Sequence, residues 1–245
     1  IAPDAEAQTL EQYQERAGEE NPGVRSERKA YQAAQEAARE VRSPDDPLLS
    51  FGYFVSPPSP RQVKFSVMQS LPWFGSFRTA GEAADLAAQA QYQAWLDAGH
   101  AARYRAALAW FELHEWQELL AVERRNRVLL ESYKEIATIK FEGGQGTMAN
   151  VLRLDIRLKE AETRIDILQN RRRSLVAQFN RVLGRPIDET VALADTLVYA
   201  PPGLSAVPVD TALSKNPRLD NLELLAESAE RRRELARKRG APNFS

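Results

Sequence analysis

The sequence predicts a mainly α-helical fold: a long antiparallel α-helical coiled-coil hairpin, one β-hairpin and an internal structural repeat. Three observations lead to this fold class. The segment 76–141 has no proline and is rich in helix-forming residues. After a glycine-rich reversal, residues 151–182 carry apolar side chains in alternating steps of three and four, which is the spacing of a coiled-coil seam. Residues 48–68 instead alternate apolar and polar side chains, as strands do.

Composition excludes several classes of protein. The chain has 245 residues, of which 43% are hydrophobic and 27% charged, so it is too polar for a helical membrane protein and too apolar to be disordered. A net charge of -1 gives no electrostatic reason to expect a nucleic-acid partner. The absence of cysteine excludes disulfides, thiolate catalysis and cysteine-ligated zinc from these residues. Ile1 to Leu10 lacks the features of a signal peptide, so if the protein is exported we expect its signal to have been removed.

The N-terminal part is predicted to form a helix and then two strands. Asn21-Pro22 opens a helix that reaches about Arg42, because proline suits a first helical turn and alanines recur at helical spacing. The strands lie on either side of a proline-rich turn at 57–60. The alternation predicts one apolar face on these strands. Periodicity alone does not distinguish whether this face contacts membrane lipid or a soluble core. Its residues are Leu49, Phe51, Tyr53, Val55, Val63, Phe65 and Val67.

Trp73 and Phe74 follow the second strand and its Leu71-Pro72 dipeptide. A membrane barrel places aromatic side chains at this point, where its strands leave the hydrocarbon layer. Trp95, Trp110 and Trp116 differ, because they fall inside the predicted long helix and are interpreted as packing residues.

The helix predicted from Ser76 to Phe141 could span about 100 Å at the helical rise of about 1.5 Å per residue. The segment 142–147 has three glycines in four positions and should reverse the chain. The return helix, predicted from Thr147 to Leu183, has a heptad seam that only Arg172 interrupts. We expect this side chain to extend to solvent or to find a carboxylate on an adjoining helix.

An internal repeat is indicated by a second Asn-Pro pair, Asn216-Pro217, which lies 195 residues after Asn21-Pro22. The same offset relates Pro47 to Pro242, so a helix followed by a strand is begun twice.

Residues that could carry chemistry are few. His100 and His114 are about 21 Å apart by helical rise, too far to share a metal ion. A His114 and Glu118 pair is better interpreted as a solvated helix face. The arginine runs at 171–173 and 231–233 are interpreted as ion-paired faces and not as a nucleic-acid site. No nucleophile, phosphate-loop or metalloprotease motif is present. We therefore expect no enzyme, no cofactor, no metal and no nucleic acid.

Several segments together resemble the TolC-type outer-membrane efflux channels, also called outer membrane efflux proteins. They are Asn21-Pro22, the strand Leu48 to Val55, Gln69 to Gly75, Lys140 to Gly144, Asn150 to Leu152, Leu183 to Pro186 and Asn216-Pro217. The resemblance covers nearly the whole chain as an N-terminal half plus the start of the second repeat. It implies a trimer in which β-hairpins build one membrane β-barrel and long helices build a periplasmic tunnel. Two stacked short helices match one long helix in such a tunnel.

The resemblance also implies a function, a location and partners. The protein would be a homotrimeric outer-membrane channel subunit of a tripartite efflux or secretion system, located in a Gram-negative outer membrane with its helices in the periplasm. It would act as a passive conduit fed by an inner-membrane pump through a periplasmic adaptor, and outer-membrane lipid would contact the strand face. The adaptor would dock at the helical tip, whose residues here are Gly143, Gly144, Gln145, Gly146, Thr147 and Asn150. Asn150 stands where the family often has an aspartate.

The expected division of the chain follows from these elements. Three copies of two strands give fewer than the roughly eight strands of the smallest bacterial barrels, so we expect the chain to be part of a longer protein. A periplasmic adaptor or a soluble coiled-coil scaffold remains the alternative. The predicted regions are an N-terminal segment with the first short helix (1–47), the barrel strands (48–72), the long α-hairpin (73–185), an irregular connection (186–215), and the second short helix with the start of a third strand (216–245).

Overall fold

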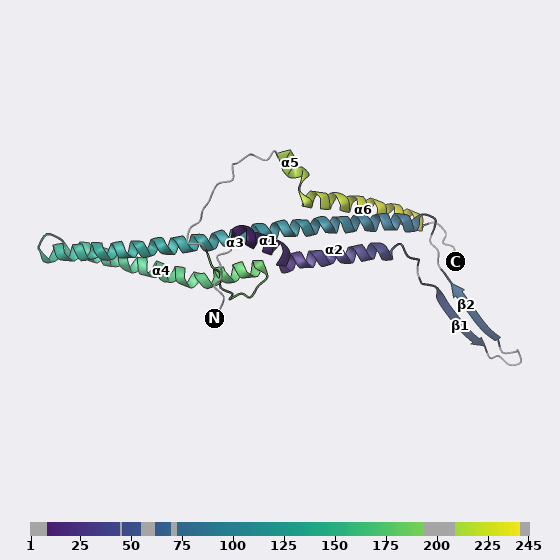
Figure 1. Ribbon diagram of the computed structural model, residues 1–245, viewed down its shortest axis with the longest axis horizontal. Coiled ribbons are helices and arrows are strands. Elements are labelled where there is room, and N and C mark those ends of the chain that lie inside the picture. The colour runs from purple at the N-terminus through teal and green to yellow at the C-terminus, as the bar shows by residue number, and fades with distance from the viewer. Residues whose placement is uncertain (1–8, 45, 55–61, 70–72, 194–208, 241–245) are drawn as a thin grey trace. The chain divides into compact units, whose positions relative to one another are not determined.

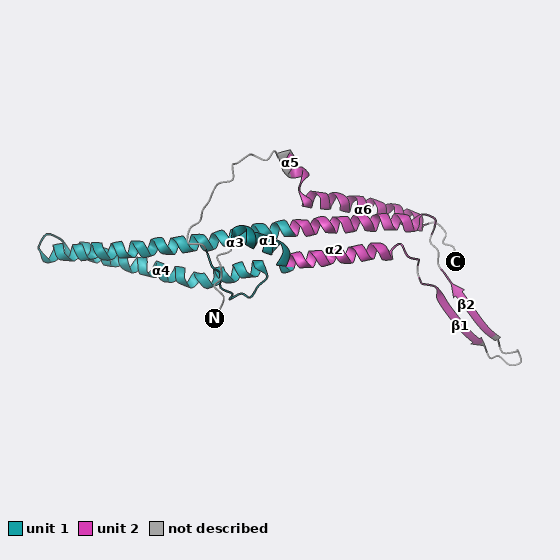
Figure 2. Cartoon of the chain, viewed as in Figure 1, with its two compact units in different colours: residues 1–22, 99–203 teal, residues 23–98, 204–245 magenta. Residues whose placement is uncertain are grey.

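A computed structural model describes residues 9–44, 46–54, 62–69, 73–193 and 209–240. In these residues the order of elements is helix, helix, strand, strand and four further helices (Figure 1). The chain divides into two compact units (Figure 2). Unit 1 comprises residues 1–22 and 99–203, and unit 2 comprises residues 23–98 and 204–245. The long helix α3 (Ser76–Glu142) contributes to both units.

Unit 1 is built on the antiparallel pairing of α3 with α4 (Met148–Leu183). Leu120, Ile165 and Leu168 form a buried cluster between the two helices. The indole N–H of Trp116 donates to the main-chain carbonyl of Leu168 at 2.7 Å. The predicted seam on α4 is confirmed, because the buried apolar side chains of that helix follow the heptad: Leu158, Ala161, Ile165, Leu168, Leu175 and Phe179.

Arg172, which interrupts that seam, is exposed, but the partner found for it is not a carboxylate. Its guanidinium lies 6.0 Å from the centre of the Trp116 ring, on the adjoining helix. A guanidinium over an indole face is attracted by the negative face of the ring. The Arg172 side chain thus extends to solvent, as expected, and its neighbour on the adjoining helix is an aromatic ring and not a carboxylate.

A short helix, α1 (Leu10–Glu20), precedes the first Asn-Pro pair and was not predicted. Thr9 and Gln12 form a capping box at its N-terminus. Its buried face holds Tyr13 and Ala17, and the Tyr13 ring meets the Phe179 ring of α4 edge-on at 4.9 Å. The spacing of these apolar residues and the capping pair were the signals that would have identified α1.

The end of α4 meets the junction between α1 and α2 (Pro22–Glu40). The side-chain amide of Asn21 donates to the Val182 carbonyl at 2.7 Å. Gly184 ends α4 with φ of 70°, and a Cβ built on it would lie 2.8 Å from the Glu20 carbonyl oxygen and 3.0 Å from Cδ of Pro22. Only glycine combines a left-handed conformation with this close approach. The C-terminus of α4 therefore packs closely against the end of α1 and the first residue of α2.

In unit 2 the N-terminal part of α3 has a helix on each of two faces. The first is α2, where Gln91 donates to Glu27 at 2.6 Å and Tyr31 lies 5.3 Å from Tyr92 between ring centres. The second is α6 (Pro217–Arg239), where the Ser228 hydroxyl donates to the Ala83 carbonyl at 2.8 Å. A further helix, α5 (Val209–Ser214), falls within the connection for which no regular structure was predicted.

The two Asn-Pro pairs both stand at the start of a helix that flanks α3. The Asn216 side chain accepts a hydrogen bond from the Arg218 main chain and so caps α6. α6 runs antiparallel to α3, because Asn221 donates to the Ala90 carbonyl while Lys238 donates to the Thr79 hydroxyl. The repeat inferred from sequence spacing thus corresponds to two helices with equivalent neighbours. The third strand expected after Gly240 lies outside the described residues.

The β-hairpin consists of β1 (Leu48–Phe54) and β2 (Gln62–Met68), which pair antiparallel. Its register places Leu49 opposite Val67, Phe51 opposite Phe65 and Tyr53 opposite Val63. Directly opposed residues project from the same face of a sheet. The register therefore brings the predicted apolar residues of both strands onto one face.

Candidate functional site

The first candidate surface is the reversal between α3 and α4. The main-chain N–H of Gly143 donates to the Ile139 carbonyl at 3.0 Å, and that of Gln145 donates to the Lys140 carbonyl at 2.8 Å. Gly144 has φ of 72°, which places it in the left-handed conformation that ends many helices. These bonds satisfy the last carbonyls of α3 and fix a tight, ordered turn.

Gly146 and Thr147 lead from this turn into α4. A Cβ built on Gly146 would lie 3.0 Å from the Phe141 main-chain nitrogen, so a side chain would displace the end of α3. Thr147 occupies the N-cap position with extended backbone angles but makes no side-chain cap bond. Asn150 lies in the first turn of α4 and accepts a long hydrogen bond of 3.5 Å from Arg153. The structure thus brings all six predicted tip residues together in one turn and the first turn of the next helix.

The tip residues present a mostly uncharged surface. Gly143, Gly144, Gln145, Thr147 and Asn150 are exposed, and Gly146 is partly buried. Met148 adds an exposed apolar side chain next to them. Such a surface offers main-chain and amide groups to a partner, without a carboxylate at position 150.

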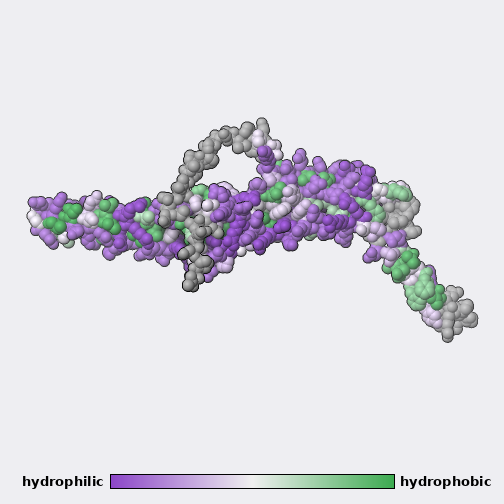
Figure 3. All heavy atoms as spheres, viewed as in Figure 1, coloured by the Kyte–Doolittle hydropathy of each residue, from purple (hydrophilic) through white to green (hydrophobic). Residues whose placement is uncertain are grey.

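The second candidate surface is the apolar face of the β-hairpin in unit 2. The Phe51 and Phe65 rings lie 5.1 Å apart between centres, and both side chains are well exposed. Figure 3 shows hydrophobic colouring over the strands. Six of the seven predicted residues are exposed on this face, and the seventh, Val55, lies outside the described residues: Leu49, Phe51, Tyr53, Val63, Phe65 and Val67.

The predicted interfacial aromatic pair, Trp73 and Phe74, follows the strands and directly precedes α3. The Trp73 and Phe74 rings contact each other edge-on at 6.2 Å, and Phe74 is 81% exposed. Gly75, with φ of 77°, turns the chain into α3 directly after them. The pair is thus held at the start of the long helix.

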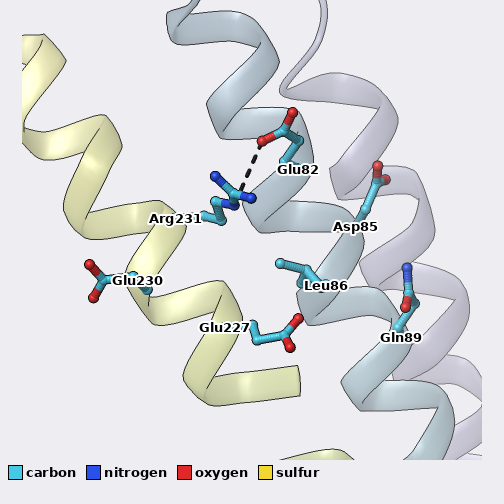
Figure 4. Close-up of a pocket in the computed structure, with 7 residues that line it drawn as sticks. All are labelled: Glu82, Asp85, Leu86, Gln89, Glu227, Glu230 and Arg231. Carbon is cyan, nitrogen blue, oxygen red and sulfur yellow. Dashed lines mark ion pairs between the residues drawn. The ribbon is translucent and has the colours of Figure 1, made fainter. Parts of the chain in front are cut away.

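An open groove of about 700 Å³ lies between α3 and α6 in unit 2 (Figure 4). Its acidic lining is largely neutralised by arginines: Arg231 lies 3.7 Å from Glu82, Arg42 pairs with Asp85, and Arg233 pairs with Glu230 at 3.1 Å. The ion pairs of Arg231 and Arg233 agree with the ion-paired face predicted for residues 231–233. The groove itself could not be predicted from sequence patterns, because it depends on the register of two helices far apart in the chain. Its ion pairs are those of a packed helix interface.

The histidine singled out in the sequence lies in the helical interior. His114 is buried and contacts the Trp110 ring at 4.0 Å between ring centres. Burial lowers its pKa from the usual 6.5, and the nearby Glu118 carboxylate partly offsets this by favouring the charged form. The solvated-face interpretation of this side chain is wrong. Among the residues that the structure describes, no group of three or more His, Asp or Glu side chains is arranged to hold a metal ion.

Among the described helices, none has both the length and the apolar character that crossing a membrane requires.

Several solved structures similar to this chain are outer-membrane proteins or outer-membrane channels of bacteria. The chain is similar to the outer membrane protein VceC from Vibrio cholerae, with a TM-score of 0.78 and 17% identity over 96% of this chain and 60% of that one. It is similar to the outer-membrane channel OprN, with a TM-score of 0.75 and 19% identity over 91% of this chain and 54% of that one. The Neisseria gonorrhoeae MtrE outer membrane channel gives a TM-score of 0.75 and 18% identity over 96% and 55% of the two chains.

The fold implied by the sequence resemblance is confirmed: this chain has the fold of the TolC-like outer-membrane channels. It spans little more than half the length of the structures it matches. No protein-family model matches the sequence, and no curated protein does.

Proposed function

We propose that this chain is part of an outer-membrane channel subunit, and that the channel is a passive conduit of a tripartite efflux or secretion system. The proposal rests above all on one observation. The chain combines the long helical hairpin with a β-hairpin that presents six exposed apolar residues on one face, and outer-membrane channels share its fold over at least 91% of the chain. This likeness supports the channel over an adaptor or a scaffold.

The strand face suits contact with lipid. Removing an apolar side chain from water stabilises by about 25 cal/mol per Å² of surface, so exposed leucine, valine and phenylalanine favour a hydrocarbon environment. Polar and small residues alternate with this face, with Ser50 opposite Ser66 and Gly52 opposite Lys64. This alternation matches a barrel with a lipid-facing outside and a polar inside. Trp73 and Phe74 then belong at the membrane interface, and the helices in the periplasm.

A homotrimer is part of the proposal, since one hairpin leaves both strand edges without a neighbour in this chain's described sheet. A closed barrel would remove these edges, and strands contributed by three copies of the chain would help to close it. We assign docking of a periplasmic adaptor, which connects the channel to an inner-membrane pump, to the tip residues Gly143 to Thr147 and Asn150. No bond is made or broken in this function, and no cofactor enters it.

Electron microscopy of detergent-extracted particles tests the proposal. The protein should be made from its native reading frame, including any coding sequence after Ser245. Threefold particles with a helical tunnel on the order of 100 Å long are expected. Compact monomers in the soluble fraction would contradict the channel and favour the scaffold.

The tip assignment has its own test. Gln145→Arg and Thr147→Arg place a long cation on exposed positions of the turn without altering its glycines. Both should reduce co-purification of the adaptor, whereas Asn170→Arg, at an exposed position on the shaft of α4, should not. Equal recovery of the adaptor with all three variants would contradict docking at the tip.

A further inference from the structure

Basic residues gather where the helices of unit 2 meet the β-hairpin. The segments 65–81 and 235–245, which include the start of α3 and the end of α6, contain four basic residues and no acidic residue. The whole chain has 33 basic and 34 acidic residues, so this excess of positive charge is local. We term its members the basic cluster: Arg78 in the first turn of α3, and Arg237, Lys238 and Arg239 in the last turn of α6.

Lys238 joins the two parts of the basic cluster. Its ammonium group donates to the Thr79 hydroxyl at 2.6 Å, so the end of α6 lies beside the start of α3 (Figure 1). Consecutive residues are about 100° apart around a helix. Arg237 and Arg239 therefore lie on either side of Lys238 and flank the line along which α6 contacts α3.

Arg237 and Arg239 are exposed, and among the residues that the structure describes neither has an ion pair. Carboxylates in the neighbouring turns already have partners, since Glu234 pairs with Lys238 at 2.9 Å and Glu82 pairs with Arg78 at 3.2 Å. A helix C-terminus favours cations, which accounts for their presence there. It does not account for two segments without any acidic residue.

The basic cluster lies close to the proposed membrane interface. β2 ends at Met68, and Trp73 and Phe74 follow before α3 begins. Interfacial aromatic side chains lie at the level of lipid headgroups. The Lys238 ammonium is 3.7 Å from a Cβ built on Gly75, the residue directly after this pair. Long basic side chains at this level extend into the layer of headgroup phosphates.

We infer that the basic cluster binds the phosphate groups of anionic phospholipids in the periplasmic leaflet. The inference rests on the proposed function and adds a lipid class to it, because the strands contact hydrocarbon whereas the basic cluster contacts charged headgroups. Each cation close to an anionic lipid surface strengthens binding by about a factor of five, and salt weakens this attraction. Arg237 and Arg239 carry most of it, since no described carboxylate neutralises them.

Native mass spectrometry of the detergent-extracted channel tests the inference, with protein made from the native reading frame and any sequence after Ser245 included. Anionic phosphatidylglycerol and zwitterionic phosphatidylethanolamine are titrated separately, and the bound lipids are counted. The test variant carries Arg237→Gln and Arg239→Gln, which remove two charges and keep good helix formers. The matched control carries Arg171→Gln and Arg173→Gln, at two exposed positions of α4 with the same spacing.

The parent and the control should prefer phosphatidylglycerol, and the test variant should bind it about 25-fold more weakly at low salt. A variant with Arg237→Lys and Arg239→Lys should keep the preference, because lysine also binds phosphate as a point charge. An unchanged preference in the test variant would overturn the inference. Displacement of the lipid by inorganic phosphate, beyond the effect of sodium chloride at equal ionic strength, would assign the basic cluster to a soluble anion and overturn it as well.

Particle images of the same samples separate this inference from the proposed function. Threefold particles with no lipid preference in the parent would overturn the lipid site and leave the channel standing. Compact monomers in the parent sample would contradict the channel, and the lipid site with it. If the double glutamine variant does not assemble, the single variants Arg237→Gln and Arg239→Gln replace it, each with a loss of about five-fold expected.

Discussion

Asn21 donates its side-chain amide to the carbonyl of Val182 at 2.7 Å, across 161 positions of the chain. The bond joins the α1–α2 junction to the last turn of α4, where main-chain carbonyls have no partner within the helix. Replacing Asn21 with alanine should lower the free energy of unfolding by about 1–2 kcal/mol, because a part-buried carbonyl loses its donor.

Chemical denaturation of the two proteins would measure this difference. Gln35→Ala is a suitable control, since the Gln35 side chain bonds only to an exposed Tyr31 hydroxyl on its own helix among the hydrogen bonds described for it. An Asn21→Ala loss no larger than that of Gln35→Ala would show that the bond between the helix ends contributes little.

Gly184 should not tolerate a side chain. Alanine there would adopt a left-handed conformation that costs about 1–2 kcal/mol, and its Cβ would also meet the Glu20 carbonyl. Gly144→Ala separates the two effects, because Gly144 has a similar φ of 72° but no heavy atom within 4 Å of the added carbon. Thermal unfolding should rank the loss of stability as Gly184→Ala, then Gly144→Ala, then Gly240→Ala, whose φ is −76°. Equal losses at positions 184 and 144 would show that the close contact with Glu20 relaxes freely.

His114 should make stability depend on pH. Burial holds its pKa below 6.5 in the folded protein, whereas in the unfolded chain it has its ordinary value. The unfolded state therefore binds more protons in this range, and stability falls as the pH is lowered from above 6.5 through the folded pKa. His114→Phe should remove this part of the pH dependence, which is measured as the difference in unfolding free energy between about pH 7.5 and about pH 5 for the two proteins.

Glu118→Gln supplies the complementary change. It removes the carboxylate that favours protonated His114, so the folded pKa should fall further and the loss of stability should extend to lower pH. A pH profile of His114→Phe parallel to that of the parent would mean that His114 is not protonated more easily in the unfolded chain.

Trp116 should stabilise the α3–α4 pair through its N–H group as well as its ring. Trp116→Phe keeps an aromatic ring beside Arg172 but leaves the Leu168 carbonyl without the indole donor. A loss of about 0.5–1.5 kcal/mol is expected in denaturation experiments. Trp95→Phe is the comparison. Trp95 stacks on Tyr31 in unit 2, and phenylalanine keeps an aromatic ring at that position. A smaller loss for Trp116→Phe than for Trp95→Phe would contradict a role for the N–H group.

Much of the fold could be predicted because its signals are local. The glycines at 143–146 and the alternation in 62–68 each determine structure within a few residues, and the opposed pairs of the β-hairpin result directly from the alternation. The heptad seam of α4 was also readable, since each step depends on helical periodicity alone.

Other features depend on contacts between distant segments. The sequence near Arg172 contains no sign of Trp116, and Ser228 appears as an ordinary polar helix residue until α3 covers it. His114 was assigned to a solvated face for the same reason. For α1 a local signal existed in the capping pair of Thr9 and Gln12, so that helix could have been predicted. The roles of the tip and strand residues stay predictions, because their partners are other molecules.

The register of the β-hairpin bears on how the proposed channel subunit would reach the membrane. Six apolar side chains are exposed on one face of the two strands. Exposed strands of this kind readily pair with strands of other chains and aggregate. In the proposed channel, a newly made chain would therefore need protection in transit, and its strands should be the last part to reach lipid, after the helices have formed.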